Sequence, residues 1–160
     1  VEFTHHEGSE GTIRWIEEEK QPAVYSGEAT VEGLEHWVRG LLTKSEPLPE
    51  PQDGDSVIVV GQTFEDIVLR PDKDVFLLIY APWCGFSRKF IPVYEELARE
   101  MAQVPHVVVA KMDGDLNGSP YPDDFRWNAY PTVFFVRAGS RTPAVFHGNR
   151  TIARLVEFAQ

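Results

Sequence analysis

Cysteine is nearly absent from this sequence, because only one of its 160 residues, Cys84, carries a thiol. A single thiol excludes an internal disulfide framework and any multi-cysteine zinc site within the chain. Cations are also scarce: 15 Lys and Arg stand against 25 Asp and Glu, which gives a formal net charge of −10. Nucleic-acid binders need clustered positive charge, so we expect no nucleic acid among the partners.

Long apolar runs and a targeting segment are missing as well. No apolar run approaches the roughly 20 residues that cross a bilayer, so we expect no membrane contact from this segment. The first residues lack the basic and apolar pattern of a targeting peptide, so an export signal would lie outside this sequence or have been removed from it. Hydrophobic residues nevertheless make up 42% of the chain, a content that predicts a folded protein.

The larger part of the sequence alternates between strand-like and helix-like segments. The expected strands cover residues 56–60, 75–80, 106–112, 132–136 and 144–147, and the expected helices cover residues 63–69, 84–101 and 123–127, with a last helix capped by Thr151. Its βαβ units favour parallel strands, and its final hairpin is antiparallel. The order βαβαβαββα therefore predicts an α/β fold with a mixed sheet flanked by helices.

An internal repeat links the first residues to the last ones. Thr12–Ile16 parallels Thr132–Val136, and Pro22–Tyr25 parallels Pro143–Phe146. Gly27, Thr30 and Leu34 then match Gly148, Thr151 and Leu155 in the same register. The repeat predicts that residues 1–45 form the strand–strand–helix end of a preceding domain with the same fold, which would belong to a longer chain.

A connector separates the two parts. Within residues 46–55, three prolines stand at alternate positions among acidic residues, and Gly54 comes after them. This composition favours an extended linker. We therefore predict domains at residues 1–45 and 56–160.

Cys84 occupies an informative place, between an expected buried strand and the start of a helix. The unpaired amides and the dipole at a helix N-terminus favour a thiolate, and Arg88 and Lys89 add positive charge one turn later. We therefore predict an activated, partly exposed thiol.

The residues around Cys84 carry a family resemblance. Ala81-Pro82-Trp83-Cys84-Gly85 is similar to the active site of the thioredoxin superfamily, and specifically of the catalytic domains of protein disulfide isomerases. Other stretches resemble the same family in the same order, namely Val59–Phe64, Val109–Asp113, Ala129–Phe135 and Gly148–Thr151. The resemblance implies a thioredoxin fold for residues 56–160, preceded by the end of a second thioredoxin-like domain.

The same resemblance suggests roles for the residues near the thiol. It implies a cis peptide between Tyr130 and Pro131 that faces Cys84, beside backbone that pairs with an extended client. The residues that it assigns to substrate binding are Trp83, Gly85, Phe86, Tyr130 and Pro131. The cations that it places near the active site, as candidates for tuning it, are Arg88, Lys111 and Arg150.

Two positions depart from the family pattern. Ser87 stands where the family has its second cysteine, and a serine stabilises the thiolate of Cys84 without being able to form a disulfide. Leu78 stands where family members commonly carry a buried glutamate that moves the second cysteine's proton. The two changes agree with each other, which favours a natural loss of dithiol chemistry over a laboratory Cys→Ser substitution. We take Cys84 and Ser87 as the catalytic pair of positions.

These observations predict a protein disulfide isomerase-like protein with a single-cysteine Cys-x-x-Ser site. It would form mixed disulfides with cysteine-containing client proteins or a partner thiol protein in the endoplasmic reticulum lumen, during folding or retention, as a redox chaperone impaired in dithiol oxidoreduction. We expect no cofactor and no metal site. Asn117 and Asn149 begin glycosylation sequons and are candidate glycan sites.

Two other interpretations remain open. The domain could be a non-catalytic binding module of a multidomain protein, with Cys84 as a relic. Alternatively, Cys84-Gly85-Phe86-Ser87 is similar to the site of monothiol glutaredoxins, which bind an iron–sulfur cluster with glutathione, although the remaining motifs of the chain do not follow that family.

Overall fold

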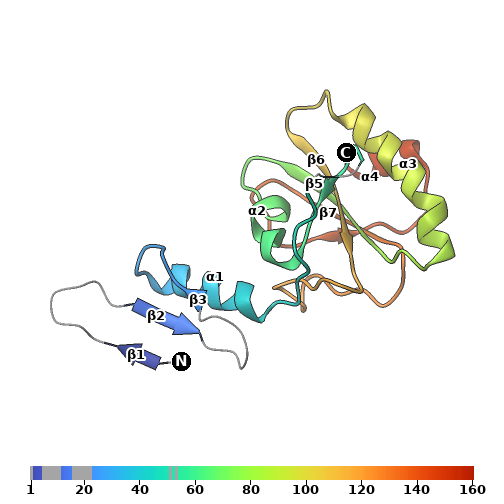
Figure 1. Cartoon of the computed structure of the whole chain (residues 1–160). Helices are drawn as coiled ribbons and strands as arrows, with labels where there is room; N and C mark the ends of the chain where they lie inside the picture. Colours follow the sequence, from blue (N-terminus) through green and yellow to red (C-terminus); the bar gives the residue numbers. More distant parts are fainter. Residues whose placement is uncertain (1, 5–11, 16–22, 51, 53) are drawn as a thin grey trace. The chain divides into compact units, whose positions relative to one another are not determined.

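The chain forms two compact units, residues 1–41 and 42–160. The structure, a computed structural model, describes residues 2–4, 12–15, 23–50, 52 and 54–160 (Figure 1). Ile16 and Pro22, which belong to the predicted repeat, lie outside the described residues, as do residues 51 and 53 of the predicted linker. Within the described residues, no helix is both long enough and apolar enough to cross a membrane.

The second unit is built on a five-stranded mixed sheet with the strand order β4-β6-β5-β7-β8. Its strands are β4 (Val57–Ile58), β5 (Asp74–Tyr80), β6 (Val107–Asp113), β7 (Thr132–Val136) and β8 (Ala144–Val145). Strand β6 pairs in parallel with β4 and β5, while β7 pairs antiparallel with β5 and β8. This arrangement confirms the predicted α/β fold with a mixed sheet.

Helices cover both faces of this sheet (Figure 1). A 3₁₀ turn, η1 (Gly61–Thr63), leads into α2 (Phe64–Val68) on one face, and α3 (Gly85–Met101) and α4 (Ile152–Phe158) lie on the other. The central strand β5 explains the two layers, because its side chains alternate between the faces. Val75, Leu77 and Ile79 pack with α2, whereas Phe76 and Leu78 pack under α3 and α4.

One predicted element does not form. Residues 123–127 were expected to be a short helix, but they follow a single turn in which Asp124 and Phe125 donate their amide hydrogens to the carbonyl of Tyr121. The Phe125 side chain is buried between Phe64 and Phe134. Burial of this one ring fixes the segment as a turn, so the observed order has one helix fewer than the predicted one.

The first residues of the second unit are fastened to the rest of it before the first strand begins. Asn117 accepts hydrogen bonds at Oδ1 from the amides of Glu46 and Gly61, and its Nδ2 donates to Glu46 and to the carbonyl of Asp113. The carbonyl of Lys44 accepts from Gly118. The boundary between the compact units therefore lies a few residues before the predicted linker at residues 46–55.

Among its described residues, the first unit contains an antiparallel sheet with the order β1-β2-β3 and one helix. Its elements are β1 (Glu2–Thr4), β2 (Thr12–Trp15), β3 (Ala23–Val24) and α1 (Val31–Leu42). Strands β2 and β3 followed by α1 reproduce the expected strand–strand–helix order, and β1 is an element that sequence reasoning did not predict. The Thr30 hydroxyl accepts a hydrogen bond from the Gly33 amide and caps α1.

Candidate active site

Cys84 lies at the junction that the sequence predicted, as the N-cap residue of α3. The chain leaves β5 at Tyr80 and turns sharply, and the Cys84 amide donates to the carbonyl of Ala81 at 3.0 Å. The first hydrogen bond of the helix then runs from the Arg88 amide to the Cys84 carbonyl, also at 3.0 Å. Cys84 is partly exposed, so its sulfur combines a helix N-terminus with access to solvent.

The surroundings of Cys84 favour the thiolate. The pKa of Cys84 is lowered, chiefly by a hydrogen bond from the Ser87 backbone, and burial opposes this shift. The Ser87 hydroxyl, the Phe86 amide and the positive charge of Arg88 lower the pKa further. Among the predicted tuning residues, Arg88 is thus one whose charge reaches the thiol.

Ser87 is fully buried one turn into the helix. Its hydroxyl oxygen accepts a weak hydrogen bond from the Ala81 amide at 3.4 Å. Ser87 therefore holds the turn that presents Cys84 as well as contributing a hydrogen bond to the sulfur. Gly85, between them, is exposed at the start of the helix.

The loop before β7 supplies the second side of the site. The Tyr130–Pro131 peptide is cis, as predicted, and the Cys84 thiol donates to the Tyr130 carbonyl at 3.5 Å. Arg150 lies behind this loop, where its guanidinium donates to the Pro131 carbonyl at 3.1 Å. The contact places Arg150 on the backbone of the proline loop, one residue beyond the carbonyl that meets the thiol.

Two large aromatic side chains flank the thiol and face solvent. Trp83 is 66% exposed and Phe86 is 70% exposed. The Trp83 ring meets the Tyr130 ring edge to face, with 5.9 Å between their centroids. Exposed apolar surface of this kind is suited to contact with another chain. Among the residues predicted to bind substrate, Tyr130 contacts the sulfur through its carbonyl, Pro131 follows it, and the other three lie within two residues of Cys84 along the chain; their role in binding stays a prediction.

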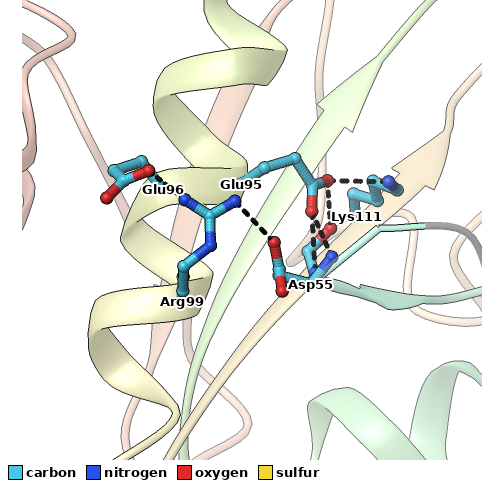
Figure 2. Close-up of polar contacts among 6 residues, drawn as sticks. Asp55, Glu95, Glu96, Arg99 and Lys111 are labelled. Atoms are coloured by element: carbon cyan, nitrogen blue, oxygen red, sulfur yellow. Dashed lines mark hydrogen bonds and ion pairs between the residues drawn. The ribbon is translucent and has the colours of Figure 1, made fainter.

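Lys111 lies elsewhere. It is buried on β6, and its ammonium contacts a carboxylate oxygen of Glu95 on α3 at 2.7 Å (Figure 2). Lys111 is not among the groups that shift the pKa of Cys84. In this structure it joins helix to sheet, about three helical turns along α3 from the thiol.

Leu78, the second departure from the family pattern, is fully buried next to Lys111. The two are register partners on β5 and β6, so their side chains project from the same face of the sheet. Leu78 packs there with Phe90 and Tyr94 of α3. An acid at position 78 would enter this apolar layer, and the carboxylate that pairs with Lys111 comes from the helix instead.

The two predicted sequons differ in their surroundings. Asn117 is 2% exposed, and both ends of its amide group are hydrogen-bonded within the fold. This burial counts against the glycan site predicted at Asn117, because a free amide nitrogen is needed and the fold already uses it. Asn149 is exposed on the turn before α4.

Sequence reasoning missed two acids that the structure brings into use. Asp115, just after β6, accepts hydrogen bonds from Trp83 and from Tyr130. Glu95 accepts from Lys111, Ser56 and the Asp55 amide. A signal existed for Asp115, because the carboxyl ends of the parallel strands β5 and β6 meet at one edge of the sheet, where Cys84 also lies. No such signal existed for Glu95, because the helical spacing does not show whether Glu95 or its neighbour Glu96 faces the sheet.

Comparison with known proteins gives matches over the second unit and beyond it. The thioredoxin family model matches residues 55–160. Protein disulfide isomerase-like 1-4 of Oryza sativa subsp. japonica is 38% identical over 143 residues, which cover 82% of this chain and 24% of the relative. Protein disulfide isomerase-like 1-3 of Arabidopsis thaliana is 36% identical over 150 residues, which cover 88% of this chain and 25% of the relative.

A solved structure agrees with these matches. The first thioredoxin domain of mouse protein disulfide-isomerase A4 superposes with a TM-score of 0.56 and 28% identity, covering 68% of this chain and 79% of that domain. The chain spans about a quarter of the length of the curated relatives that it matches.

Proposed function

Because the chain belongs to the thioredoxin family, we propose that it acts as a protein disulfide isomerase-like protein whose one thiol, Cys84, forms mixed disulfides with client or partner proteins. The observation that carries this proposal is the position of the Cys84 sulfur at a helix N-terminus, where the pKa of the thiol is lowered. A lowered pKa favours the attacking thiolate, and the Tyr130 carbonyl beside the sulfur belongs to the backbone that would pair with a client.

The proposed step is a thiol–disulfide exchange. The thiolate of Cys84 attacks one sulfur of a client disulfide, a new bond forms between the two sulfurs, and the client's other sulfur leaves as a thiolate that takes up a proton. No external oxidant is needed, because one disulfide replaces another. Release requires a thiolate from outside the domain, such as a client thiol, a partner protein or glutathione, because Ser87 has no sulfur to offer.

The surface around the sulfur would hold the client during this step. Exposed Trp83 and Phe86 offer apolar contact, and the backbone at Tyr130 and Pro131 would pair with an extended segment. Gly85 leaves open space at the start of α3, since a methyl group placed there meets no atom within 4 Å apart from those of its chain neighbours and the helix backbone. Slow release from such a site favours retention of clients and chaperone-like capture over rapid isomerisation.

We place the protein in the endoplasmic reticulum lumen. Client disulfides persist in oxidising compartments, so an attacking thiol of this kind has substrates there. The exposed sequon at Asn149 and the similarity to protein disulfide isomerases support the same compartment. Residues 1–45 would be the end of a preceding thioredoxin-like domain of the same parent chain.

The lifetime of the client adduct tests the single-thiol mechanism. The chain and its Ser87→Cys variant are mixed with a disulfide-containing client, and the covalent adduct is followed on non-reducing gels. We expect Ser87→Cys to shorten the adduct lifetime by about tenfold or more, because it supplies an internal thiolate. Cys84→Ser should form no adduct, and Ser87→Ala, which adds no sulfur, should keep a long-lived one. Equal lifetimes for the chain and Ser87→Cys would contradict the mechanism.

A non-catalytic binding domain is the second candidate, and the exposed Trp83 and Phe86 favour it. The two candidates differ in what Cys84 does. If Cys84→Ser binds a reduced, unfolded client as tightly as the unchanged chain while Cys84 fails to react with a thiol reagent, the domain works by binding alone.

A further inference from the structure

Asp115 touches both sides of the proposed active site. It follows β6 in the loop that begins at Gly114, and its carboxylate accepts hydrogen bonds from the indole of Trp83 and from the phenol of Tyr130, the latter at 3.0 Å. Trp83 precedes the thiol in the chain, and the Tyr130 carbonyl is the group that the thiol contacts. One carboxylate therefore joins the loop that carries the sulfur to the loop that carries the cis-proline.

The fold holds this carboxylate in place from the other side. The Asp113 side chain accepts from the Asp115 amide at 2.8 Å and so closes the turn after β6. The ammonium group of Lys44 donates to the Asp115 carbonyl, which ties the same turn to the first residues of the second unit. Asp115 is thus anchored through its backbone while its side chain is free to act on the site.

Close packing brings the aromatic rings to this carboxylate. A methyl group on Gly114 would lie 2.7 Å from the Tyr130 ring and 2.6 Å from Ile79, both too short for carbon, and 3.0 Å from the Trp127 indole nitrogen, which is tight. Glycine at this position leaves room for the Tyr130 ring beside the loop, where the phenol reaches Asp115. Burial raises the pKa of Tyr130, and the hydrogen bond to Asp115 raises it as well, so the phenol keeps its proton and remains a donor.

A geometric role can be separated from an electrostatic one. The groups that lower the pKa of Cys84 are Ser87, Phe86 and Arg88, and Asp115 is not among them. Trp83, on the other hand, is mostly exposed and would sample several orientations without its bond to a fixed acceptor.

We propose that Asp115 is a positioning residue of the Cys84 site: its carboxylate bridges Trp83 and Tyr130 and so holds the sulfur at the carbonyl of the cis-proline loop. The inference rests on the proposed function, because Cys84 is taken as the attacking thiol. Asp115 affects the thiol only by holding the loops that carry Trp83 and Tyr130. It neither contacts the client nor transfers a proton.

Two substitutions distinguish geometry from charge. Asp115→Asn removes the charge but keeps both bonds, since its oxygen accepts from the indole and its amide nitrogen donates to the phenol oxygen. Asp115→Ala removes both bonds. Asp124→Ala, at an exposed acid in the following turn, changes the net charge equally and serves as the control.

Two measurements are made on the full chain. Time-resolved fluorescence anisotropy of Trp83, obtained by difference from Trp83→Phe, reports the freedom of the indole. The pH profile of Cys84 alkylation by iodoacetamide reports the thiol. We expect Asp115→Ala to raise the ratio of freely moving to held indole about two- to tenfold, the change that one hydrogen bond makes in an equilibrium. The alkylation midpoint should move to lower pH, because the thiol loses the carbonyl to which it donates. Asp115→Asn and Asp124→Ala should match the unchanged chain in both measurements.

Other results overturn the inference. Equal shifts in Asp115→Asn and Asp115→Ala would mean that charge matters and geometry does not, and no shift in Asp115→Ala would mean that neither does. Should Asp115→Ala fail to fold, Tyr130→Phe removes the bond that holds the proline loop and must move the alkylation midpoint in the same direction. If Cys84 in the unchanged chain resists iodoacetamide, the proposed function fails, while the anisotropy of Trp83 still decides whether Asp115 holds the indole.

Discussion

The two ends of the chain contain the same local pattern in very different surroundings. In the first unit, Tyr25 and Trp37 bring their ring centroids to 5.4 Å; in the second unit, the matching residues Phe146 and Phe158 also lie 5.4 Å apart. Thr30 and Thr151 each accept a hydrogen bond from an amide three residues later. The strand–strand–helix pattern therefore forms the same local contacts in both places, which supports the proposal that residues 1–45 end a preceding thioredoxin-like domain.

The two copies of the pattern differ in how deeply their residues are buried. Leu155 of α4 is fully buried, whereas α1 has no buried residue, so the matching Leu34 stays partly exposed. The reason is the neighbouring strand: β7 pairs with the central strand β5 of a complete sheet, while the described strands that flank α1 in the sequence form only a three-stranded sheet. Local sequence is enough to form a capped helix and an aromatic pair, but a core requires strands from elsewhere in the domain.

The strongest test of this contrast compares the two matched leucines. Leu155→Ala should lower the free energy of unfolding of the second unit by about 3 kcal/mol, because it leaves a cavity in a closed core. Leu34→Ala should cost less than about 1 kcal/mol, because Leu34 is partly exposed and its truncation removes little buried apolar area. Urea denaturation followed by circular dichroism measures both. Equal losses would show that α1 is packed in a core in solution.

The next test concerns how the second unit fixes the residues that enter it. Glu95 accepts from the Asp55 amide at 2.6 Å and from the Ser56 hydroxyl at 2.7 Å, and it pairs with Lys111 (Figure 2). Glu95→Gln should destabilise the second unit by about 2 kcal/mol, because it leaves the buried ammonium of Lys111 without its counter-charge. Glu96→Gln, at the neighbouring exposed acid, is the matched control and should change stability by less than about 0.5 kcal/mol.

The same carboxylate predicts a dependence on pH. Burial raises the pKa of Glu95, but hydrogen bonds from Lys111, Ser56 and Asp55 outweigh it, and the pKa is below its ordinary value of 4.5. A lowered pKa in the folded state means that the stabilisation is present above pH 4.5 and is lost as the pH falls through the folded pKa. The urea midpoint of the unchanged chain should therefore fall below pH 4.5 more steeply than that of Glu95→Gln. If the urea midpoints of the two proteins fall equally steeply with pH, Glu95 does not contribute to the loss of stability in acid.

The smallest effect comes from the matched helix caps. Thr151→Ala should lower the stability of the second unit by about 1 kcal/mol, the usual worth of an N-cap. Thr30→Ala should reduce the helical content of α1 and leave the unfolding transition of the second unit unchanged. Amide hydrogen exchange resolves the two regions. A shift of the second unit's transition in Thr30→Ala would mean that the two units unfold together.

Much of the candidate site was within reach of sequence reasoning. The apolar run before Cys84 and the helical spacing after it placed the thiol at a strand-to-helix junction, and the family resemblance placed Pro131 opposite it. The helix predicted at residues 123–127 was wrong, because Asp123 and Asp124 have low helix propensity and the segment makes a single turn with Phe125 buried. Lys111 was expected near the thiol by resemblance alone, and its actual partner depends on a helix face that the pattern does not specify.

The sequence by itself determined the strands of the second unit, its last capped helix, the lone thiol at the start of α3 and the absence of a second one, since each depends on residues a few positions apart. Tertiary structure alone decided which groups meet across longer separations: the Cys84 thiol with the Tyr130 carbonyl 46 residues away, Glu95 with Lys111 16 residues away, and Asn117 with Glu46 71 residues away. Periodicity specifies which face of an element is apolar, but only the order and register of the strands bring a particular polar atom to its partner.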